Sequence, residues 1–256
     1  MLTPDQLTQY ATNGYVVLPS LLAADEVAAF RDAARADLER QAAGGDVMHK
    51  ADAEGNVTLL KLWNQAGDDI YGRVARDQRL VDIAIDVLGE DTYVYSHKMT
   101  MKQPRTGGAW EWHQDYGYWY QNRCLVPDMT SIWIALDPSH ADNGCLQVLE
   151  GSHRIGRLDH LRVNDQTVVD TEYLDAAVAR FELSYVEMEP GDALVFHCNL
   201  LHRSDANRSD GPRWGYIVSY NTAANRPFRD VRDYGRYEEL RPVPAGSFRD
   251  AAPPEG

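Results

Sequence analysis

The stretch YVEMEPGDALVF at residues 185–196 decides the fold class, because it holds two strand-like runs around a turn. Residues 185–188 and 193–196 are short and carry the valine and aromatic side chains that strands favour. Glu189–Asp192 lies between them, and its proline followed by glycine is a strong turn signal. The stretch therefore predicts two short strands joined by a tight turn.

Further strand-like runs lie between Gly89 and residue 222. They are bounded by glycine, proline or polar residues, and they cover residues 92–102, 130–136, 146–149 and 214–220. Many short strands preceded by helices predict a mainly β protein with flanking helices. The expected core is a double-stranded β-helix, the jelly-roll or cupin-like architecture.

The part before Gly89 has mostly helical patterning. Thr3 is an expected N-cap with Pro4 at the first helical position, and both residue types favour a helix start. The elements expected here are a helix from Pro4 to Gly14, a strand at 15–19, a helix at 25–42 ending at Gly44-Gly45, a polar loop at 46–58 and a helix at 69–88 ending at Gly89.

The length of 256 residues fits a single domain. We expect it to span residues 1–245, with a helical part at about 1–89 and the β-helix core at about 90–222. Residues 155–180 are polar and weakly patterned, so we expect a lid or an irregular insert. Residues 246–256 end in Pro-Pro-Glu-Gly and are predicted to be a disordered tail.

The formal net charge of −14 argues against a nucleic-acid surface, because phosphate binding needs clustered Lys and Arg. Cys124, Cys145 and Cys198 show no paired spacing, and an odd number suits a reducing compartment. The first residues lack a signal-peptide pattern, and no apolar run reaches membrane-spanning length. We therefore expect a cytoplasmic protein with no nucleic-acid or membrane partner, and the oligomeric state stays open.

A His-x-Asp motif at His113 and Asp115 is a candidate metal site. In an extended segment, residues two apart point to the same side, so the imidazole and the carboxylate would converge. Two histidines and one carboxylate make up the facial triad of non-haem Fe(II) enzymes, so a third ligand is needed. We expect His202, 89 residues downstream, to supply it. The rival, His197, belongs to an apolar strand run and is expected to be a buried structural histidine.

Arg213 follows His202 by eleven residues, at the start of the last strong strand. A 2-oxo diacid that chelates iron through one end needs a cation at its far carboxylate. The planar guanidinium of arginine binds a carboxylate through two parallel hydrogen bonds. The spacing therefore indicates a diacid site beside the metal.

Several separated motifs follow one another over about residues 90–222. They are Lys102-Gln-Pro with Gly107-Gly108, His113-Gln-Asp115, Ser131-Ile-Trp133-Ile-Ala-Leu, Asn143-Gly-Cys-Leu with Gly151-Ser-His153, Pro190-Gly-Asp192, and His202-Arg-Ser204 with Asn207-Arg-Ser209 and Arg213. Their order and spacing resemble the phytanoyl-CoA dioxygenase-like family of Fe(II)/2-oxoglutarate-dependent oxygenases.

The resemblance implies that Fe(II) is bound by His113, Asp115 and His202, and that 2-oxoglutarate and O2 are cosubstrates. It also implies that Arg213 and Ser204 hold the tail carboxylate of 2-oxoglutarate. The other positions that it assigns to the cosubstrate are Gln114, Trp133, Lys98 and Lys61. Halogenating relatives have a small residue in place of the aspartate, so Asp115 favours hydroxylation of a C–H bond or a related oxidation, with release of succinate and CO2.

Six aromatic residues lie at positions 110–120, and we expect those before the metal motif and those after it to have different roles. Trp110 and Trp112 alternate with the metal motif and should pack in the core or under a helix. Tyr116, Tyr118 and Trp119 follow the motif and are expected to contact the substrate.

Trp119 matches a substrate-contacting position of ectoine hydroxylases, a branch of the same family. The remainder of that signature is absent, because Gly117, Tyr120 and Arg123 replace its residues. An aromatic wall suits a small amphipathic or cationic molecule. The alternative is that these rings only fill the mouth of the barrel. Acyl-CoA is disfavoured by the lack of a basic cluster for its phosphates.

Two other functions stay open at this point. One is a cupin-like hydrolase or isomerase that uses the same ligands without 2-oxoglutarate, although Ser204 and Arg213 speak against it. The other is a non-catalytic binding module on a degenerate barrel, which would be expected to have lost a ligand or the arginine.

Overall fold

The computed structural model describes residues 1–41, 47–163, 166–229 and 235–251. The helices are α1 Pro4–Asn13, α2 Ala24–Gln41, α3 Ile70–Ala75, α4 Gln78–Leu88, α5 Asp115–Gln121 and α6 Thr171–Val178. The strands are β1 Tyr15–Leu18, β2 Met48–Ala51, β3 Val57–Trp63, β4 Thr92–Lys102, β5 Trp110–His113, β6 Met129–Ala135, β7 Leu146–Leu149, β8 His160–Val163, β9 Gln166–Val169, β10 Leu183–Val186, β11 Ala193–His197, β12 His202–Ser204 and β13 Arg213–Thr222.

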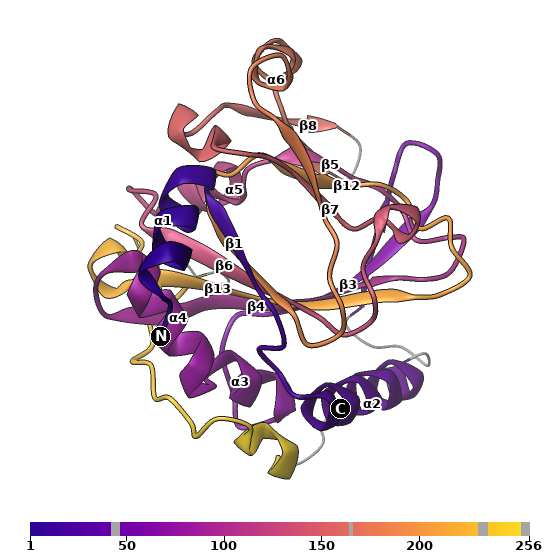
Figure 1. Ribbon diagram of the computed structural model, residues 1–256, viewed down its shortest axis with the longest axis vertical. Coiled ribbons are helices and arrows are strands. Elements are labelled where there is room, and N and C mark those ends of the chain that lie inside the picture. Colours follow the sequence, from indigo (N-terminus) through magenta and orange to yellow (C-terminus); the bar gives the residue numbers. More distant parts are fainter. Residues whose placement is uncertain (42–46, 164–165, 230–234, 252–256) are drawn as a thin grey trace.

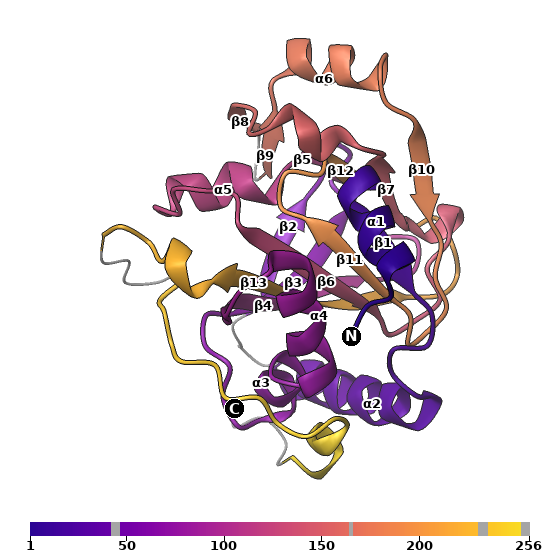
Figure 2. The same cartoon turned by 60° about the vertical axis from the view of Figure 1, so that its left-hand side comes forward.

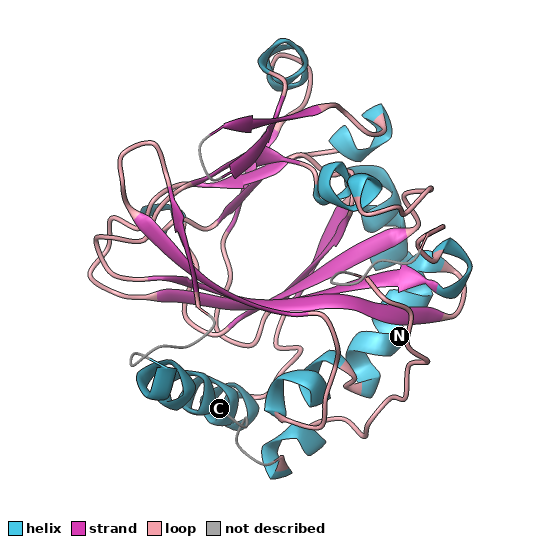
Figure 3. Ribbon diagram, turned by 180° about the vertical axis from the view of Figure 1, so that it is seen from behind, coloured by secondary structure: helices cyan, strands magenta, loops and turns pink. Residues whose placement is uncertain are grey.

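Two antiparallel sheets face each other and form the core (Figure 1). The large sheet has seven strands in the order β1-β11-β6-β13-β4-β3-β2, and the small sheet has four in the order β10-β7-β12-β5. Helices α2, α3 and α4 cover the outer face of the large sheet, as the rear view also shows (Figure 3). The predicted jelly-roll core with flanking helices is confirmed.

Alternation along β4 separates the two faces of the large sheet. Met99 and Met101 point outward into the core that the sheet forms with the helices. Lys98, Thr100 and Lys102 point inward and line a cavity between the sheets. A strand buried on both faces thus carries polar side chains on one of them. This arrangement is costly unless those side chains serve a site.

Local signals at the helix ends act as predicted. Thr3 accepts a hydrogen bond from the backbone of Gln6 and completes a capping box, and Pro4 is the first helical residue. Gly14 and Gly89 end α1 and α4 in the left-handed conformation that glycine adopts without strain.

Three predictions for the first 89 residues need correction. The expected loop at 46–58 contains β2 and the start of β3, which extend the large sheet. The expected single helix at 69–88 is two helices, because Asp77 leaves the helical conformation and caps α4 through the backbone N–H of Arg79. The part is therefore not simply helical. The last residue of the helix expected at 25–42, and the Gly44-Gly45 stop, lie outside the described residues.

The segment at 155–180 is more regular than predicted. It contains the β8–β9 pair and α6, which lie over the small sheet (Figure 2). Strand β9 packs beside β5, the strand that ends in His113. The segment therefore covers the back of one candidate ligand.

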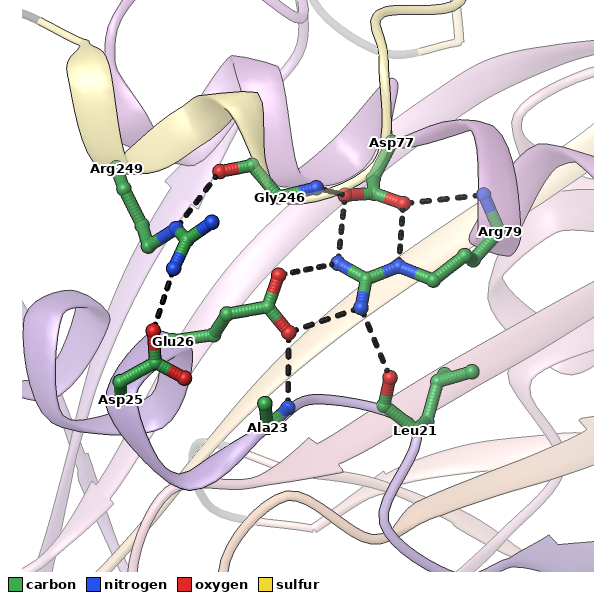
Figure 4. Close-up of polar contacts among 8 residues, drawn as sticks. All are labelled: Leu21, Ala23, Asp25, Glu26, Asp77, Arg79, Gly246 and Arg249. Carbon is green, nitrogen blue, oxygen red and sulfur yellow. Dashed lines mark hydrogen bonds and ion pairs between the residues drawn. The ribbon is translucent and has the colours of Figure 1, made fainter.

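The predicted disordered tail is wrong for residues 246–251. A short 3-10 helix at Ser247–Asp250 buries Phe248 completely in the core beneath the large sheet. Gly246 donates its N–H to Asp77 Oδ2 at 2.8 Å, and Arg249 pairs with Asp25 on α2 (Figure 4). One large buried ring and this polar anchoring hold a segment whose local sequence has no strong pattern. Residues 252–256 lie outside the described residues.

Arg79 joins these elements through two forked hydrogen-bond pairs (Figure 4). Its guanidinium donates to both oxygens of Asp77 and both oxygens of Glu26, each at 2.9 Å. Burial alone would raise the pKa of Glu26, but hydrogen bonds from Arg79 and from the backbone of Ala23 hold it below its ordinary value. We call Glu26, Asp77, Arg79 and Gly246 the Arg79 network.

None of the described helices is long and apolar enough to cross a membrane. Cys124, Cys145 and Cys198 are all buried free thiols.

Candidate active site

A cavity between the two sheets brings together most of the polar residues that the sequence singled out. Its empty volume is about 600 Å³, including the open mouth. His113, Asp115, His202, Ser204 and Arg213 all line it. Asp115 contacts Ser131, the cross-strand partner of Ser219, whereas Arg213 lies six residues before Ser219 on β13, so the His-Asp-His group and Arg213 lie towards opposite ends.

The three candidate metal ligands converge although two of them are 89 residues apart in the chain. His113 ends β5 and His202 begins β12, and the two are direct partners in the pairing of these strands. Their rings lie 4.1 Å apart between centroids, and His113 Nε2 is 3.9 Å from Asp115 Oδ1. All three ligand atoms lie within 4.8 Å of one another. Within the described residues this is the one such group of His, Cys, Asp or Glu side chains.

Asp115 reaches this group by a route that the sequence argument did not foresee. The chain leaves the strand at Gln114, and Asp115 is the first residue of α5, so the same-side rule for a strand does not apply. A carboxylate in the first helical turn is stabilised by the helix N-terminus. Ser131 on β6 donates a hydrogen bond to Asp115 Oδ2 at 3.0 Å, and it also contacts Ser219 on β13 at 3.0 Å. This chain of hydroxyls orients the carboxylate.

Both histidines are held in the tautomer that ligation needs. His113 Nδ1 donates to the carbonyl of Glu111 at 2.7 Å, and His202 Nδ1 donates to that of Leu200 at 2.9 Å. Each Nε2 lone pair is therefore left for the centre of the group. Burial lowers the pKa of both side chains, and for His113 the neighbouring His202 lowers it further. Two neutral imidazoles and a carboxylate fit a facial Fe(II) site.

Arg213 is buried at the other end of the cavity, with 3% of its surface exposed. Its Nε donates to the carbonyl of Gly144 at 3.1 Å, Nη2 donates to the same oxygen, and the guanidinium lies 5.2 Å above the ring of Trp133. Burial lowers the pKa of Arg213 to about 10. No carboxylate of the described residues forms an ion pair with it. A buried guanidinium that has no carboxylate partner in the protein is suited to binding an anionic ligand.

The remaining expected cosubstrate contacts divide into two groups. Trp133 and Lys98 line the cavity. Gln114 does not, because its side chain is fully engaged with the backbone of Gly156, Leu158 and Asn199, each at 2.8 Å. Lys61 does not either, because it lies on the outer face of β3 and pairs with Asp37 at 2.7 Å. Lys61 lies outside the cavity because side chains alternate between the two faces of β3, and Leu60 is the residue that faces inward.

The aromatic residues after the metal motif do not form the expected wall. Because residues 115–121 are helical, Tyr116 and Trp119 share the helix face that packs into a separate cluster with Tyr93 and Tyr95. Tyr118 meets the edge of the His113 ring at 5.9 Å but is not among the cavity residues, and its hydroxyl donates to Thr167 O at 3.0 Å.

Trp110 is a cavity residue that the parity argument assigned to the core. The β5–β12 pairing joins His113 to His202 and Trp110 to Ser204, so a bulge in β5 turns Trp110 to the same side as His113. Trp112 is buried under the 155–180 segment, as expected. A single-residue bulge leaves no signal in a sequence pattern.

Phe196, Ile217 and Lys102 also line the cavity, although the sequence assigned them no role. Phe196 meets the His202 ring at 5.0 Å. For Lys102 a signal existed, because it has the same strand parity as Lys98 on β4.

The family profile described as "Phytanoyl-CoA dioxygenase (PhyH)" matches residues 10–215. The chain belongs to this family. It is an iron- and 2-oxoglutarate-dependent dioxygenase that hydroxylates a small molecule, with O2 as the second cosubstrate. The open alternatives, a hydrolase or isomerase without 2-oxoglutarate and a non-catalytic module, are therefore set aside.

Within the phytanoyl-CoA dioxygenase family, the chain is similar to curated enzymes that act on small molecules. L-proline trans-4-hydroxylase of Streptomyces griseoviridis is 28% identical over 245 residues, which cover 89% of this chain and 90% of that protein. Ectoine dioxygenase of Stutzerimonas stutzeri is 29% identical over 240 residues, covering 85% and 76%.

Solved structures agree in fold. EctD from S. alaskensis with bound Fe superposes with a TM-score of 0.81 at 25% identity, covering 95% of this chain and 88% of that one. The same protein with 2-oxoglutarate and 5-hydroxyectoine gives a TM-score of 0.78 at 26% identity, with the same coverage.

Proposed function

We propose that His113, Asp115 and His202 hold the Fe(II) ion of this dioxygenase, and that Arg213 with Ser204 binds the distal carboxylate of 2-oxoglutarate. The observation that carries the proposal is the shared cavity. A facial donor set lies at one end, and a buried guanidinium without a carboxylate partner lies at the other. When bound, the iron supplies the oxidative chemistry on the substrate C–H bond, and the cosubstrate leaves as succinate and CO2.

The residues around the proposed metal site hold its ligands and Arg213 in place. Ser131 fixes the carboxylate of Asp115, and the carbonyls of Glu111 and Leu200 fix the two imidazoles. Trp133 packs against the guanidinium of Arg213 and keeps its plane in place.

Lys98 is the cation at the metal end of the cavity. It makes no hydrogen bond or ion pair with the described residues, and its charge lowers the pKa of both His113 and His202. We assign it to an anionic group beside the metal, either the C1 carboxylate of 2-oxoglutarate or an acidic group of the substrate. With the apolar walls of Trp110, Phe196 and Ile217, this favours a small amphipathic metabolite as substrate.

The test is formation of succinate from 2-oxoglutarate by the Fe(II)-loaded enzyme, with a panel of small amphipathic acids and amines. The panel includes L-proline and ectoine, because the relatives are named for them. We expect at least one compound to stimulate succinate formation in proportion to its own oxidation. No 2-oxoglutarate turnover with any metal loading or substrate would contradict the proposal.

The residue assignment has its own test. Replacing Arg213 with Ala should weaken 2-oxoglutarate binding far more than Fe(II) binding, because the guanidinium lies away from the metal group. Lys98→Met separates the two roles left open for Lys98. A rise in KM for 2-oxoglutarate alone indicates the C1 carboxylate, and a rise in KM for substrate alone indicates an acidic substrate. An equal loss of iron and cosubstrate binding in the Arg213 variant would contradict our assignment.

We also propose a cytoplasmic location, which the three free thiols support, since a reducing compartment keeps cysteines in that state.

A further inference from the structure

Lys102 is the most deeply buried cation of the cavity. It ends β4, only 1% of its surface is exposed, and it is the direct cross-strand partner of Arg213 on β13. Directly opposite residues of antiparallel strands have Cβ atoms about 4.5–5.5 Å apart, and like charges there repel each other. Two buried cations in register need a compensating anion.

None of the carboxylates of the described residues forms an ion pair with Lys102, although the charges of Asp205 and Asp52 lie near enough to raise its pKa somewhat against the larger effect of burial. The ammonium group of Lys102 donates to Ser204 Oγ at 2.8 Å, to Ser204 O at 3.4 Å and to the carbonyl of Asp205. These three neutral acceptors use its three donors. The carboxylate of Asp205 accepts instead from Gln147 at 2.6 Å and lies 3.7 Å from Arg203.

The contact with Lys102 determines what the Ser204 hydroxyl can do. An ammonium group has no lone pair, so Ser204 Oγ is the acceptor in this hydrogen bond. The hydroxyl proton of Ser204 is then free to point elsewhere, and Ser204 lines the cavity. The lysine thereby turns Ser204 into a donor aimed at a ligand.

Close backbone packing fixes this arrangement. Gly144 supplies the carbonyl that Arg213 binds, and its φ is +77°. A Cβ atom at Gly144 would lie 2.1 Å from Asp205 O and 3.2 Å from Lys102 Nζ. The loop that orients the guanidinium thus lies against the loop that holds the ammonium, and the two cations form one unit.

We propose that Lys102 is a positioning residue for the distal carboxylate of 2-oxoglutarate, orienting the Ser204 hydroxyl as a donor and adding a second positive charge beside Arg213. This inference rests on the proposed function of the cavity. It makes the far end of the cavity selective for a cosubstrate with two carboxylates.

The energetics agree with this role. Burial lowers the pKa of Lys102 well below its ordinary value, and the charge of Arg213 lowers it further. A carboxylate bound between the two cations would relieve both effects, whereas an apolar chain end in the same place would not. The cavity therefore pairs its buried charge with a ligand rather than with the protein.

The experiment compares 2-oxoglutarate with 2-oxovalerate, which has a methyl group in place of the distal carboxylate. The ratio of kcat/KM for the two compounds measures recognition of that carboxylate. In Lys102→Met we expect this ratio to fall at least about tenfold, through KM for 2-oxoglutarate rather than kcat. The Ser204 hydroxyl is then no longer oriented as a donor to the charged carboxylate, and the positive charge of Lys102 is removed. A Lys102→Met variant that folds and keeps the wild-type ratio would overturn the proposal.

Lys61→Met is the matched control. It removes a lysine from the neighbouring strand, but on the outer face of the sheet, where Lys61 pairs with Asp37. Its stability should fall while the ratio stays at the wild-type value. A drop in the ratio as large as that of Lys102→Met would show that any lysine loss perturbs the barrel, and it would also overturn the proposal.

Two further variants keep the test decisive if Lys102→Met does not fold. Lys102→Gln keeps hydrogen-bond donors near Ser204 without the charge, and we expect a smaller fall in the ratio than with Met. Ser204→Ala leaves the lysine in place but should lower the ratio by a similar factor, and an unchanged ratio would contradict the role given to the hydroxyl. In the double variant with Lys102→Gln and Ser204→Ala, the two reductions of the kcat/KM ratio should not multiply, because both act on the same contact with the carboxylate. Fully multiplicative losses would refute action through Ser204.

The two possible failures are distinguishable. If the wild-type enzyme turns over neither compound under any condition, the proposed function fails. If the wild-type enzyme strongly prefers 2-oxoglutarate and the variants keep that preference, only the role of Lys102 fails.

Discussion

The Arg79 network and the far end of the cavity handle buried charge in opposite ways. In the network, the guanidinium of Arg79 lies between the two carboxylates of Asp77 and Glu26, and all of these charges are paired inside the chain. In the cavity, Lys102 and Arg213 are more deeply buried than Arg79, but their hydrogen bonds to the described residues all go to neutral acceptors.

The difference separates structural charge from functional charge. A charge that is paired by the protein stabilises one arrangement of α2, α4 and the C-terminal segment. A charge that is left without an anion raises the free energy of the ligand-free protein and becomes favourable when a ligand supplies the anion. The cavity residues carry four cations and one carboxylate in a chain with a net charge of −14, so the local field opposes the global one.

The largest expected effect is at the metal end. His202→Ala removes one of the three proposed ligands and leaves the cavity without a complete donor set, so we expect succinate formation and Fe(II) binding to be lost. Loss of an outer partner alone typically reduces metal affinity or activity about 10–100-fold, and a lost ligand should exceed that. Folding should be retained, which circular dichroism of the metal-free protein can check. Wild-type iron stoichiometry in this variant would refute the assignment.

The next effect breaks the paired region. Arg79→Met leaves Asp77 and Glu26 buried without their cation, and such a change typically destabilises a protein by about 3–5 kcal/mol. Urea denaturation should show this loss, while KM for 2-oxoglutarate stays unchanged in the folded enzyme. Arg249→Met is the control, because its ion pair with Asp25 is exposed and should contribute less than about 1 kcal/mol. Equal losses in the two variants would contradict the distinction.

Arg213→Met tests the unpaired region in the same way. We expect KM for 2-oxoglutarate to rise about 10–100-fold, because a charge-assisted hydrogen bond is lost. The stability of the ligand-free protein should change little or increase, since replacing an uncompensated buried charge with an apolar side chain is often neutral or stabilising. Thermal melting without ligand measures this. A loss as large as that of Arg79→Met would erase the contrast between the regions.

The smallest effect is in the pH dependence of stability. The folded-state pKa of Glu26 lies below its ordinary value of about 4.3. Its contribution is therefore fully present above that value and is lost as the pH falls through the lower folded-state pKa. A Glu26→Gln variant should lose less stability than wild type across this acidic range. Parallel pH profiles for the two proteins would show that Glu26 is not part of the transition.

The sequence was most accurate where a local interaction determines structure. Thr3 with Pro4 starts α1, Gly14 and Gly89 end helices, and β4 spans the predicted residues 92–102 because its apolar pattern repeats with the period of a strand. His113, Asp115, His202, Ser204 and Arg213 share one cavity, as the motif spacing predicted.

Some of the errors depend on contacts with distant parts of the chain, and others on a local change of backbone conformation. The C-terminal segment is ordered by the burial of Phe248 and by Asp77, which is 169 residues away from Gly246. Gln114 is still extended and points to the opposite side from His113, whereas Trp119 points away from the cavity because the chain turns into a helix at Asp115. No side-chain cap precedes this helix, so the local sequence gives no clear signal for its start.

The sequence by itself determined the residue types of the site, their order and the alternation that gives each strand an inner and an outer face. Only the tertiary structure decided which of those residues meet. Whether a lysine faces a cavity or a carboxylate depends on which face of its strand is turned inward and on the residues packed against that face, as Lys102 and Lys61 illustrate. Side-chain chemistry is local, whereas the balance of buried charge depends on long-range contacts.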